Sequence, residues 1–174
     1  GSIETTYGGG NATSTTTSHV ELNGANTTNI YGGGNQAGVT TTNIDLITGT
    51  ASYVFGGSNQ SGTVDTTYIE AANPNQLSVE NVYGGNNQGG LTHETNVTLN
   101  GGIYTNLYGG GNMAPTDRTH VHVDGIVMNG DFFGGGNQAT VNYDTDVSFK
   151  NSSISRDLFG GGNLGIVSGN TNVF

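Results

Sequence analysis

The stretch Thr95–Asn112, with the sequence TNVTLNGGIYTNLYGGGN, is the most regular copy of a repeat that runs through this chain. Within it, Thr95, Val97 and Leu99 alternate with polar residues, the two-residue period of a strand that buries one face. Gly101 follows, and glycine tolerates the positive φ of a tight corner. A second short stretch then leads to an aromatic residue and Gly-Gly-Gly-Asn. The repeat therefore predicts two short strands separated by a corner.

The aromatic residue and the Gly-rich segment after it recur seven times, each time ending in Asn. Subtracting successive starting positions gives spacings of 24, 24, 28, 25, 25 and 26 residues, which indicates a repeat array along the whole chain. Low-complexity disordered segments do not keep an alternating apolar strand in step with such a phrase. The seven copies start at Tyr7, Tyr31, Phe55, Tyr83, Tyr108, Phe133 and Phe159.

The other copies carry the same signals in the same order. Equivalents of the Thr95 strand begin at Ser18, Thr42, Thr119 and Thr145. After the Gly-rich segment comes a third stretch with one apolar residue per copy, which predicts a third strand. These residues are Val39, Leu91, Val141 and Val167, and the corners after the first strands are predicted at Gly24, Gly101, Gly125 and Asn151.

Three short strands and three corners in about 25 residues are typical of one turn of a β-solenoid. The predicted fold class is all-β: a single-stranded parallel β-solenoid of about seven coils, each of 24–28 residues, with its handedness left open. Sustained helical spacing of apolar residues is missing from the sequence. The longest unit, Phe55 to Val82, has Asn73-Pro74-Asn75 at a corner, where a projecting loop is expected.

Residues at equal positions of a solenoid form columns along its axis. We expect the Asn column to be buried and to bond to itself and to the corner backbone. The Gly column is expected to serve close packing and positive φ, and the aromatic column to lie half-buried at an edge. A hydroxyl column should point inward. The Asn column is Asn11, Asn35, Asn59, Asn87, Asn112, Asn137 and Asn163, and the hydroxyl column is Ser18, Thr42, Thr67, Thr95, Thr119, Thr145 and Thr171.

Composition limits the partners. The 174 residues carry 13 acidic and 3 basic side chains and a formal charge of -10, which disfavours nucleic acid and anionic membrane surfaces. The chain has no cysteine and no apolar run long enough to insert into a membrane, which suits an extracellular, cell-surface or secreted protein. We interpret residues 1–174 as one repeat domain and as a fragment of a longer array. Residues 1–2 of this chain resemble a tag remnant.

The repeat phrase resembles the repeats of long surface proteins of gut-dwelling and related bacteria. The resemblance covers nearly the whole chain and rests on the motif TNVTLNGGIYTNLYGGGN. It implies a β-solenoid stalk or adhesin-like array on the cell surface. Glycans or proteins of a host or cell surface are the partners it implies.

Candidate binding residues lie on the outward side of the first strand. One predicted column there contains Asn43, Tyr68, Asn96 and His120, and a neighbouring one contains His122. His120, His122 and Asp146 are a candidate zinc or copper site, because two histidines of one strand point the same way beside a carboxylate. No cofactor is expected, although Ca²⁺ could relieve repulsion among the stacked acids Glu21, Asp45 and Glu70. Arg118 is expected to pair with Glu94 and Asp144.

Catalytic groupings are not apparent in the sequence. The Gly-rich corner lacks the Lys-Ser/Thr of a phosphate-binding loop, and the basic residues are scattered. We therefore predict a non-enzymatic structural or adhesin-like segment of an extracellular bacterial surface protein, acting as a rigid stalk or a binding face. The alternatives are a carbohydrate-binding module that uses Asn43, Tyr68, Asn96 and the aromatic column, an ice-binding solenoid, and a fibre unit that self-associates end to end.

Overall fold

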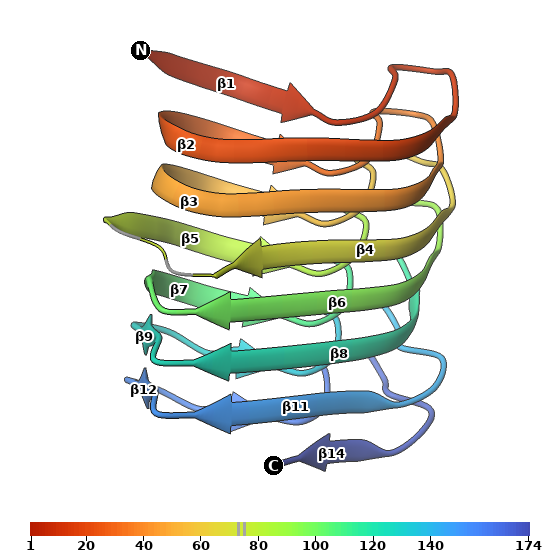
Figure 1. Ribbon diagram of the computed structural model, residues 1–174. Coiled ribbons are helices and arrows are strands. Elements are labelled where there is room, and N and C mark those ends of the chain that lie inside the picture. The colour runs from red at the N-terminus through yellow and green to blue at the C-terminus, as the bar shows by residue number, and fades with distance from the viewer. Residues whose placement is uncertain (73, 75) are drawn as a thin grey trace.

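The computed structural model describes residues 1–72, 74 and 76–174 and shows a β-solenoid of about seven stacked coils (Figure 1). Its termini lie at opposite ends of the stack. No described residue lies in a helix, and none therefore belongs to a helix long and apolar enough to span a membrane. The predicted all-β fold class and the parallel stacking are confirmed. The loop expected at Asn73-Pro74-Asn75 involves two residues, 73 and 75, outside the described part.

The strands form one parallel sheet that winds around the core, and each strand pairs with its equivalent one coil away. Pairing of Thr95 with Thr119, and of Thr119 with Thr145, confirms the register read from the repeat. The long strands β2 and β3 each run through the corner after the first strand, whereas later coils have two separate strands there, such as β6 and β7. The strands are β1 (Ser2–Tyr7), β2 (Thr15–Tyr31), β3 (Val39–Phe55), β4 (Val64–Ala71), β5 (Leu77–Tyr83), β6 (Thr92–Asn100), β7 (Ile103–Tyr108), β8 (Thr116–Asp124), β9 (Val127–Met128), β10 (Phe132–Phe133), β11 (Thr145–Lys150), β12 (Ser153–Ile154), β13 (Leu158–Phe159) and β14 (Thr171–Val173).

The third strand expected in each coil does not form as a separate element. Val39 instead opens β3, and Val141 makes only isolated bridges to Thr116 and Val167. In the same column Thr92 takes the position predicted for Leu91, because Val64 pairs with Thr92. Backbone hydrogen bonds still join neighbouring coils on this side, such as Val141 N to Ile166 O at 2.8 Å and Asn142 N to Thr116 O at 2.9 Å, but they form isolated bridges and not a regular ladder.

The corners after the first strands are as predicted. Gly24, Gly101, Gly125 and Asn151 have φ angles of 78°, 96°, 68° and 46°, where an ordinary side chain is strained. The glycines of the repeat phrase differ, because none has a positive φ among the described residues. Their role is close packing. A Cβ on Gly84 would overlap the carbonyl oxygen of Gly109 in the next coil.

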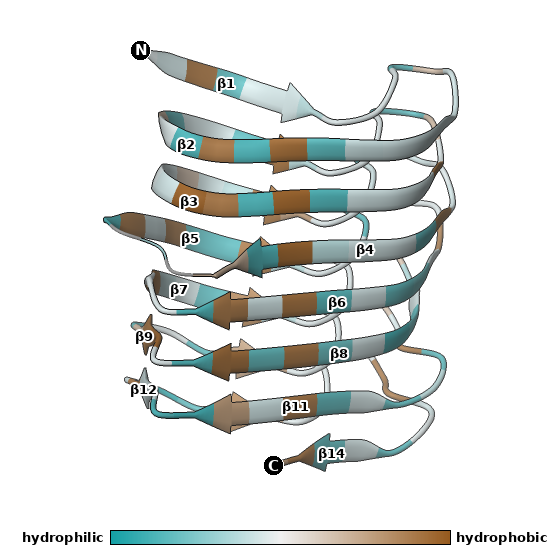
Figure 2. Ribbon diagram, viewed as in Figure 1, coloured by the Kyte–Doolittle hydropathy of each residue, from teal (hydrophilic) through white to brown (hydrophobic). Residues whose placement is uncertain are grey.

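The main core consists of apolar columns from both strand series, visible as aligned brown bands in Figure 2. Ile44, Ile69 and Leu99 are among its fully buried members, each facing inward at every second position of its strand. Burying a side chain of this size contributes about 1.5–3 kcal/mol. Although only 32% of the residues are hydrophobic, their regular spacing concentrates them inside the coil.

The inward hydroxyl column braces each coil across its interior. Thr95 Oγ1 donates a hydrogen bond of 2.6 Å to the carbonyl oxygen of Gly109, the first glycine of the same repeat's phrase. The same bond recurs from Ser18 to Gly32 at 2.5 Å and from Thr119 to Gly134 at 2.6 Å. It joins the first strand to the Gly-rich corner in every coil up to Thr145. Further members are Thr42, Thr67 and Thr145, which donate to Gly56, Gly84 and Gly160.

The aromatic column forms a continuous stack. Neighbouring rings lie 4.7–5.3 Å apart between centroids with interplanar angles of 5–10°. The prediction of half-buried rings was wrong for the five inner members, which form a second buried cluster. Each ring is covered on both sides by its neighbours, so only the end rings Tyr7 and Phe159 are exposed. Burial raises the pKa of the Tyr31, Tyr83 and Tyr108 hydroxyls.

The Asn column forms an amide ladder from Asn11 to Asn163. Each Nδ2 donates to the Oδ1 of the preceding coil at 2.8–3.0 Å. The amides are half-buried or exposed rather than buried, because the corner turns them toward the rim of the coil. Two of them also donate to the aromatic column and not to the corner backbone, since Asn59 and Asn87 bond to the hydroxyls of Tyr7 and Tyr31 at 3.1 and 3.3 Å.

Thr95→Val tests the hydroxyl brace. The substitution keeps the shape of the side chain and leaves the buried carbonyl of Gly109 without its donor, so the free energy of unfolding in urea should fall by roughly 1–3 kcal/mol. Thr98→Val is the matched control, because Thr98 lies on the same strand and points outward. It should change stability by less than about 0.5 kcal/mol. Equal losses in the two variants would contradict a stabilising role of the brace.

Gly84→Ala tests the close approach of coils. The added methyl group would meet the backbone of Gly109, which cannot rotate away, so the variant should lose at least about 1–3 kcal/mol of unfolding free energy. Gly161→Ala is the control, because the nearest side-chain atom to its Cβ is Thr171 Cγ2 at 4.0 Å. If Gly84→Ala unfolds at the urea concentration of the wild type, the packing argument is wrong.

Candidate functional site

The side chains that point outward from the first strands form a continuous surface, here called the front face. It comprises two columns that cross β2, β3, β4, β6, β8 and β11, the first of which continues onto β14. The register confirms both columns as predicted. They are His19, Asn43, Tyr68, Asn96, His120, Asp146 and Asn172, and beside them Glu21, Asp45, Glu70, Thr98, His122 and Ser148.

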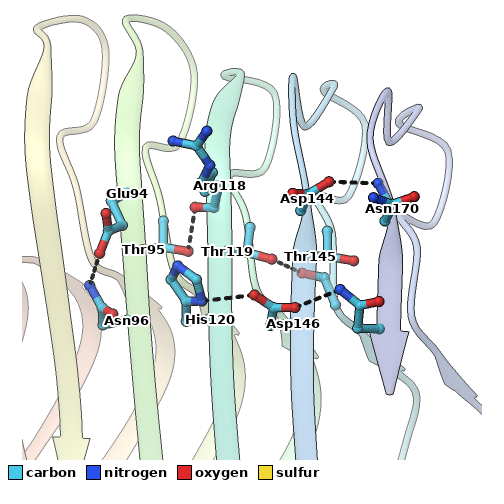
Figure 3. A network of polar contacts seen from close by, with 12 residues as sticks. Glu94, Thr95, Asn96, Arg118, Thr119, His120, Asp144, Thr145, Asp146 and Asn170 are labelled. Atoms are coloured by element: carbon cyan, nitrogen blue, oxygen red, sulfur yellow. Dashed lines mark hydrogen bonds and ion pairs between the residues drawn. The ribbon is translucent and has the colours of Figure 1, made fainter. Parts of the chain in front are cut away.

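Histidines on the front face pair with aspartates one coil away. His120 Nδ1 lies 3.2 Å from Asp146 Oδ2, and Asn172 Nδ2 donates to the other oxygen of that carboxylate at 2.7 Å (Figure 3). At the N-terminal end, His19 Nε2 lies 2.8 Å from Asp45 Oδ2. These pairs are largely exposed, so each contributes little to stability. They do fix the orientation of the carboxylates.

The candidate metal site is only partly assembled. His120 and Asp146 meet, but His122 lies in the neighbouring column beside Ser148. Nowhere in residues 1–72, 74 and 76–174 do three or more His, Asp or Glu side chains converge as metal ligands. The same holds for the acids considered for Ca²⁺. Asp45 is bonded by His19, and Glu21 accepts a 2.9 Å bond from Asn23, so polar neighbours offset their repulsion.

Two shallow grooves flank the acidic column on the N-terminal half of the front face. The first, of about 400 Å³, is here called the Tyr68 groove and is lined by Thr17, His19, Asn43, Asp45, Tyr68 and Glu70. The second, of about 360 Å³, is lined by Asp45, Leu46, Ile47, Glu70 and Ala72. Asp45 and Glu70 border both grooves. The two grooves therefore continue one another along β3 and β4.

The candidate binding residues do not converge on a single site. Asn43 and Tyr68 line the Tyr68 groove, and Asn96 stands next to Tyr68 in the following coil. His120 and His122 line a separate groove of about 290 Å³ near the C-terminal end. Asn96 also borders that groove. Asn96 thus stands between the Tyr68 groove and this groove at the C-terminal end.

A polar cluster at the entrance to the first strands was not anticipated. His93 Nδ1 lies 2.7 Å from Asp117 Oδ2, and Asn142 Nδ2 donates to Asp117 Oδ1 at 2.7 Å. Partial burial alone would raise the pKa of the Asp117 carboxyl. The hydrogen bonds from Asn142 and His93, together with the nearby charges of His93 and Arg118, outweigh burial and lower that pKa. Aligning positions 93, 117 and 142 by the repeat period would have revealed the column.

Arg118 does not form the ion pairs expected with Glu94 and Asp144. The register does place Glu94 opposite Arg118, but no described carboxylate lies within ion-pair distance of the guanidinium. The guanidinium carbon lies 4.7 Å from the ring centroid of Tyr143. In Figure 3 no contact joins the guanidinium to Glu94 or Asp144. A cation–π contact replaces the predicted pairs.

Asp117→Asn tests the polar cluster. A carboxyl with a lowered folded-state pKa stabilises the protein above its unfolded pKa of about 3.9, and this contribution is lost as the pH falls through the folded value. The variant should lose roughly 1 kcal/mol near neutral pH, and the difference should shrink in acid. Asp65→Asn, in the same column, is the control in pH-dependent urea unfolding. A loss independent of pH would contradict the electrostatic explanation.

Comparisons with protein-family models, with curated proteins and with solved structures found no match for this chain.

Proposed function

We propose that this chain is a non-enzymatic, rod-like segment of an extracellular bacterial surface protein, which holds binding groups at a distance or presents its own side faces to a partner. The observation that carries the proposal is the continuity of the side-chain ladders. The amide ladder joins all seven coils from Asn11 to Asn163, and the aromatic stack runs beside it from Tyr7 to Phe159. A shaft needs this uninterrupted coupling between neighbours.

Satisfied polar groups also support a stiff shaft. No buried side-chain nitrogen or oxygen in the described part of the chain lacks a hydrogen-bond partner. Such a polar network resists local opening, because each broken bond would leave a desolvated group. The surface location follows from the resemblance of the repeat phrase and from the acidic composition, with a formal charge of -10.

Carbohydrate binding is the second candidate, and one observation favours it in a narrower form. The inner rings of the aromatic column are buried and cannot stack on a sugar. Tyr68 is different, since 37% of its surface is exposed beside the Tyr68 groove. The candidate therefore rests on the front face rather than on the repeat phrase.

Spin-label distances test the rod. The sequence has no cysteine, so labels on Gln36→Cys and Gln138→Cys would be unique. These exposed residues belong to one column four coils apart, which places their backbones roughly 19 Å apart at a strand spacing of about 4.8 Å. We expect a single narrow distance distribution, measured by double electron–electron resonance, that persists in urea until global unfolding.

The result that would contradict the rod is a broad distribution under native conditions, since a flexible array cannot hold a partner at a fixed distance. Labels at Gln36→Cys and Gln60→Cys, which lie in adjacent coils, provide the short-distance control. Release of reducing ends or unsaturated products from plant or host polysaccharides by the purified chain would contradict its non-enzymatic role.

A further inference from the structure

The Tyr68 groove combines one flat apolar surface with oriented polar groups. Tyr68 supplies a ring with 37% of the residue exposed, and it is flanked along its column by Asn43 and Asn96. The neighbouring column contributes the carboxylates of Asp45 and Glu70. Exposed aromatic rings bury the apolar face of a ligand, while a few placed polar groups set its orientation.

Bonds to the surrounding coil hold these polar groups in place before any ligand arrives. His19 Nε2 fixes one oxygen of Asp45 at 2.8 Å. Asn43 Nδ2 donates to the backbone oxygen of Ser18 at 3.1 Å, and Asn96 Nδ2 donates to that of Thr67 at 3.4 Å. Both amide oxygens are therefore turned away from the backbone they bind. A preorganised site loses less conformational entropy on binding.

The mixture of donors and acceptors distinguishes among ligand classes. Asp45 and Glu70 only accept hydrogen bonds when ionised, whereas the Thr17 hydroxyl and the Asn43 amide can donate. Sugar hydroxyls both donate and accept, so they can use both kinds of group. An ammonium or guanidinium group only donates, and His19 already partly satisfies Asp45. The groove thus suits a polyhydroxylated neutral ligand better than a cationic peptide.

The adjoining groove extends the site beyond one sugar ring. Asn43, Asp45 and Ile47 point outward in turn along β3, a span of roughly 13 Å at about 3.3 Å per residue. Ile47 is exposed at the far end and supplies a second apolar surface. Asp45 and Glu70 stand between it and Tyr68. This order of apolar, polar and apolar groups matches the alternating faces and hydroxyl groups of a short oligosaccharide.

We propose that the Tyr68 groove and its extension to Ile47 bind consecutive pyranose units of a neutral polysaccharide, with one sugar stacked on Tyr68 and its hydroxyls bonded to Asp45, Glu70 and Asn43. This inference deepens the proposed function and rests on it, because a rod is useful as an adhesin only if one of its faces holds a ligand. The site lies on residues of the front face that differ from coil to coil.

Titration by NMR tests the proposal. Isotope-labelled protein is titrated with neutral hexasaccharides of glucose, N-acetylglucosamine and mannose. We expect at least one of them to shift the amide signals of the outward-facing residues of β3 and β4, with little dependence on salt. Tyr68→Ala should weaken that binding about tenfold or more, equivalent to roughly 1.4 kcal/mol.

Tyr53→Ala is the matched control. Tyr53 is 39% exposed, lies between Asn29 and Asn81 in its own column, and belongs to the part of β3 beyond the corner at Gly49, outside the two grooves. It should bind the sugar as the wild type does. Asp45→Asn provides a second variant, because it keeps the side-chain shape while removing the charge. It should weaken sugar binding moderately, whereas binding of a cation would be abolished.

Three outcomes would overturn the proposal: no shift with any of the three hexasaccharides, shifts away from β3 and β4, or equal losses in Tyr68→Ala and Tyr53→Ala. Salt-sensitive binding of a hexalysine peptide in the groove, without sugar binding, would assign the site to a basic partner instead and would also overturn it. Spin-label distances measured on the same protein distinguish failure of the glycan site from failure of the proposed rod. A narrow distribution without sugar binding refutes the glycan site alone, and a broad one refutes the rod.

Discussion

Along the paired strands of this solenoid, each residue has its equivalent as its nearest neighbour in the next coil. A position is therefore tolerated only if its side chain can stack upon itself about 4.8 Å away. Asn satisfies this condition because its amide is both donor and acceptor, and flat aromatic rings satisfy it by stacking. Glycine satisfies it where two backbones approach too closely for a Cβ, as between Gly84 and Gly109.

The same constraint distinguishes the columns that hold the coils together from the columns on the exposed front face. Columns that hold the coils together repeat with little change, whereas the front face places His19, Asn43 and Tyr68 in one column. Stacked like charges repel, and the structure meets this by pairing acids with donors from neighbouring coils, as His19 does with Asp45 and His93 with Asp117. Variation on the front face costs little stability, so binding groups can differ there from coil to coil.

Much of the architecture was predictable because periodicity states which residues share a column. The register of Thr95 with Thr119, the positive φ at Gly24 and Gly125, and the inward hydroxyls all followed from the repeat. The burial of the aromatic column could not be predicted in this way, since a Tyr at a corner can lie either at an exposed rim or in a second buried core. The missing third strand has a related cause. One apolar residue per copy does not show whether the backbone at that position forms a regular ladder or only isolated bridges.

The candidate site was predictable only in part. The sequence by itself determined the period, the membership of each column and the placement of Asn43, Tyr68 and Asn96 on one outward face. The tertiary structure alone decided which side chains meet across columns: that Asp45 and Glu70 border a groove with Tyr68, and that Arg118 turns to Tyr143 instead of Glu94. A repeat specifies neighbours along the axis. Contacts around the coil depend on how sharply each corner turns and on side-chain rotamers, which the spacing of residues does not encode.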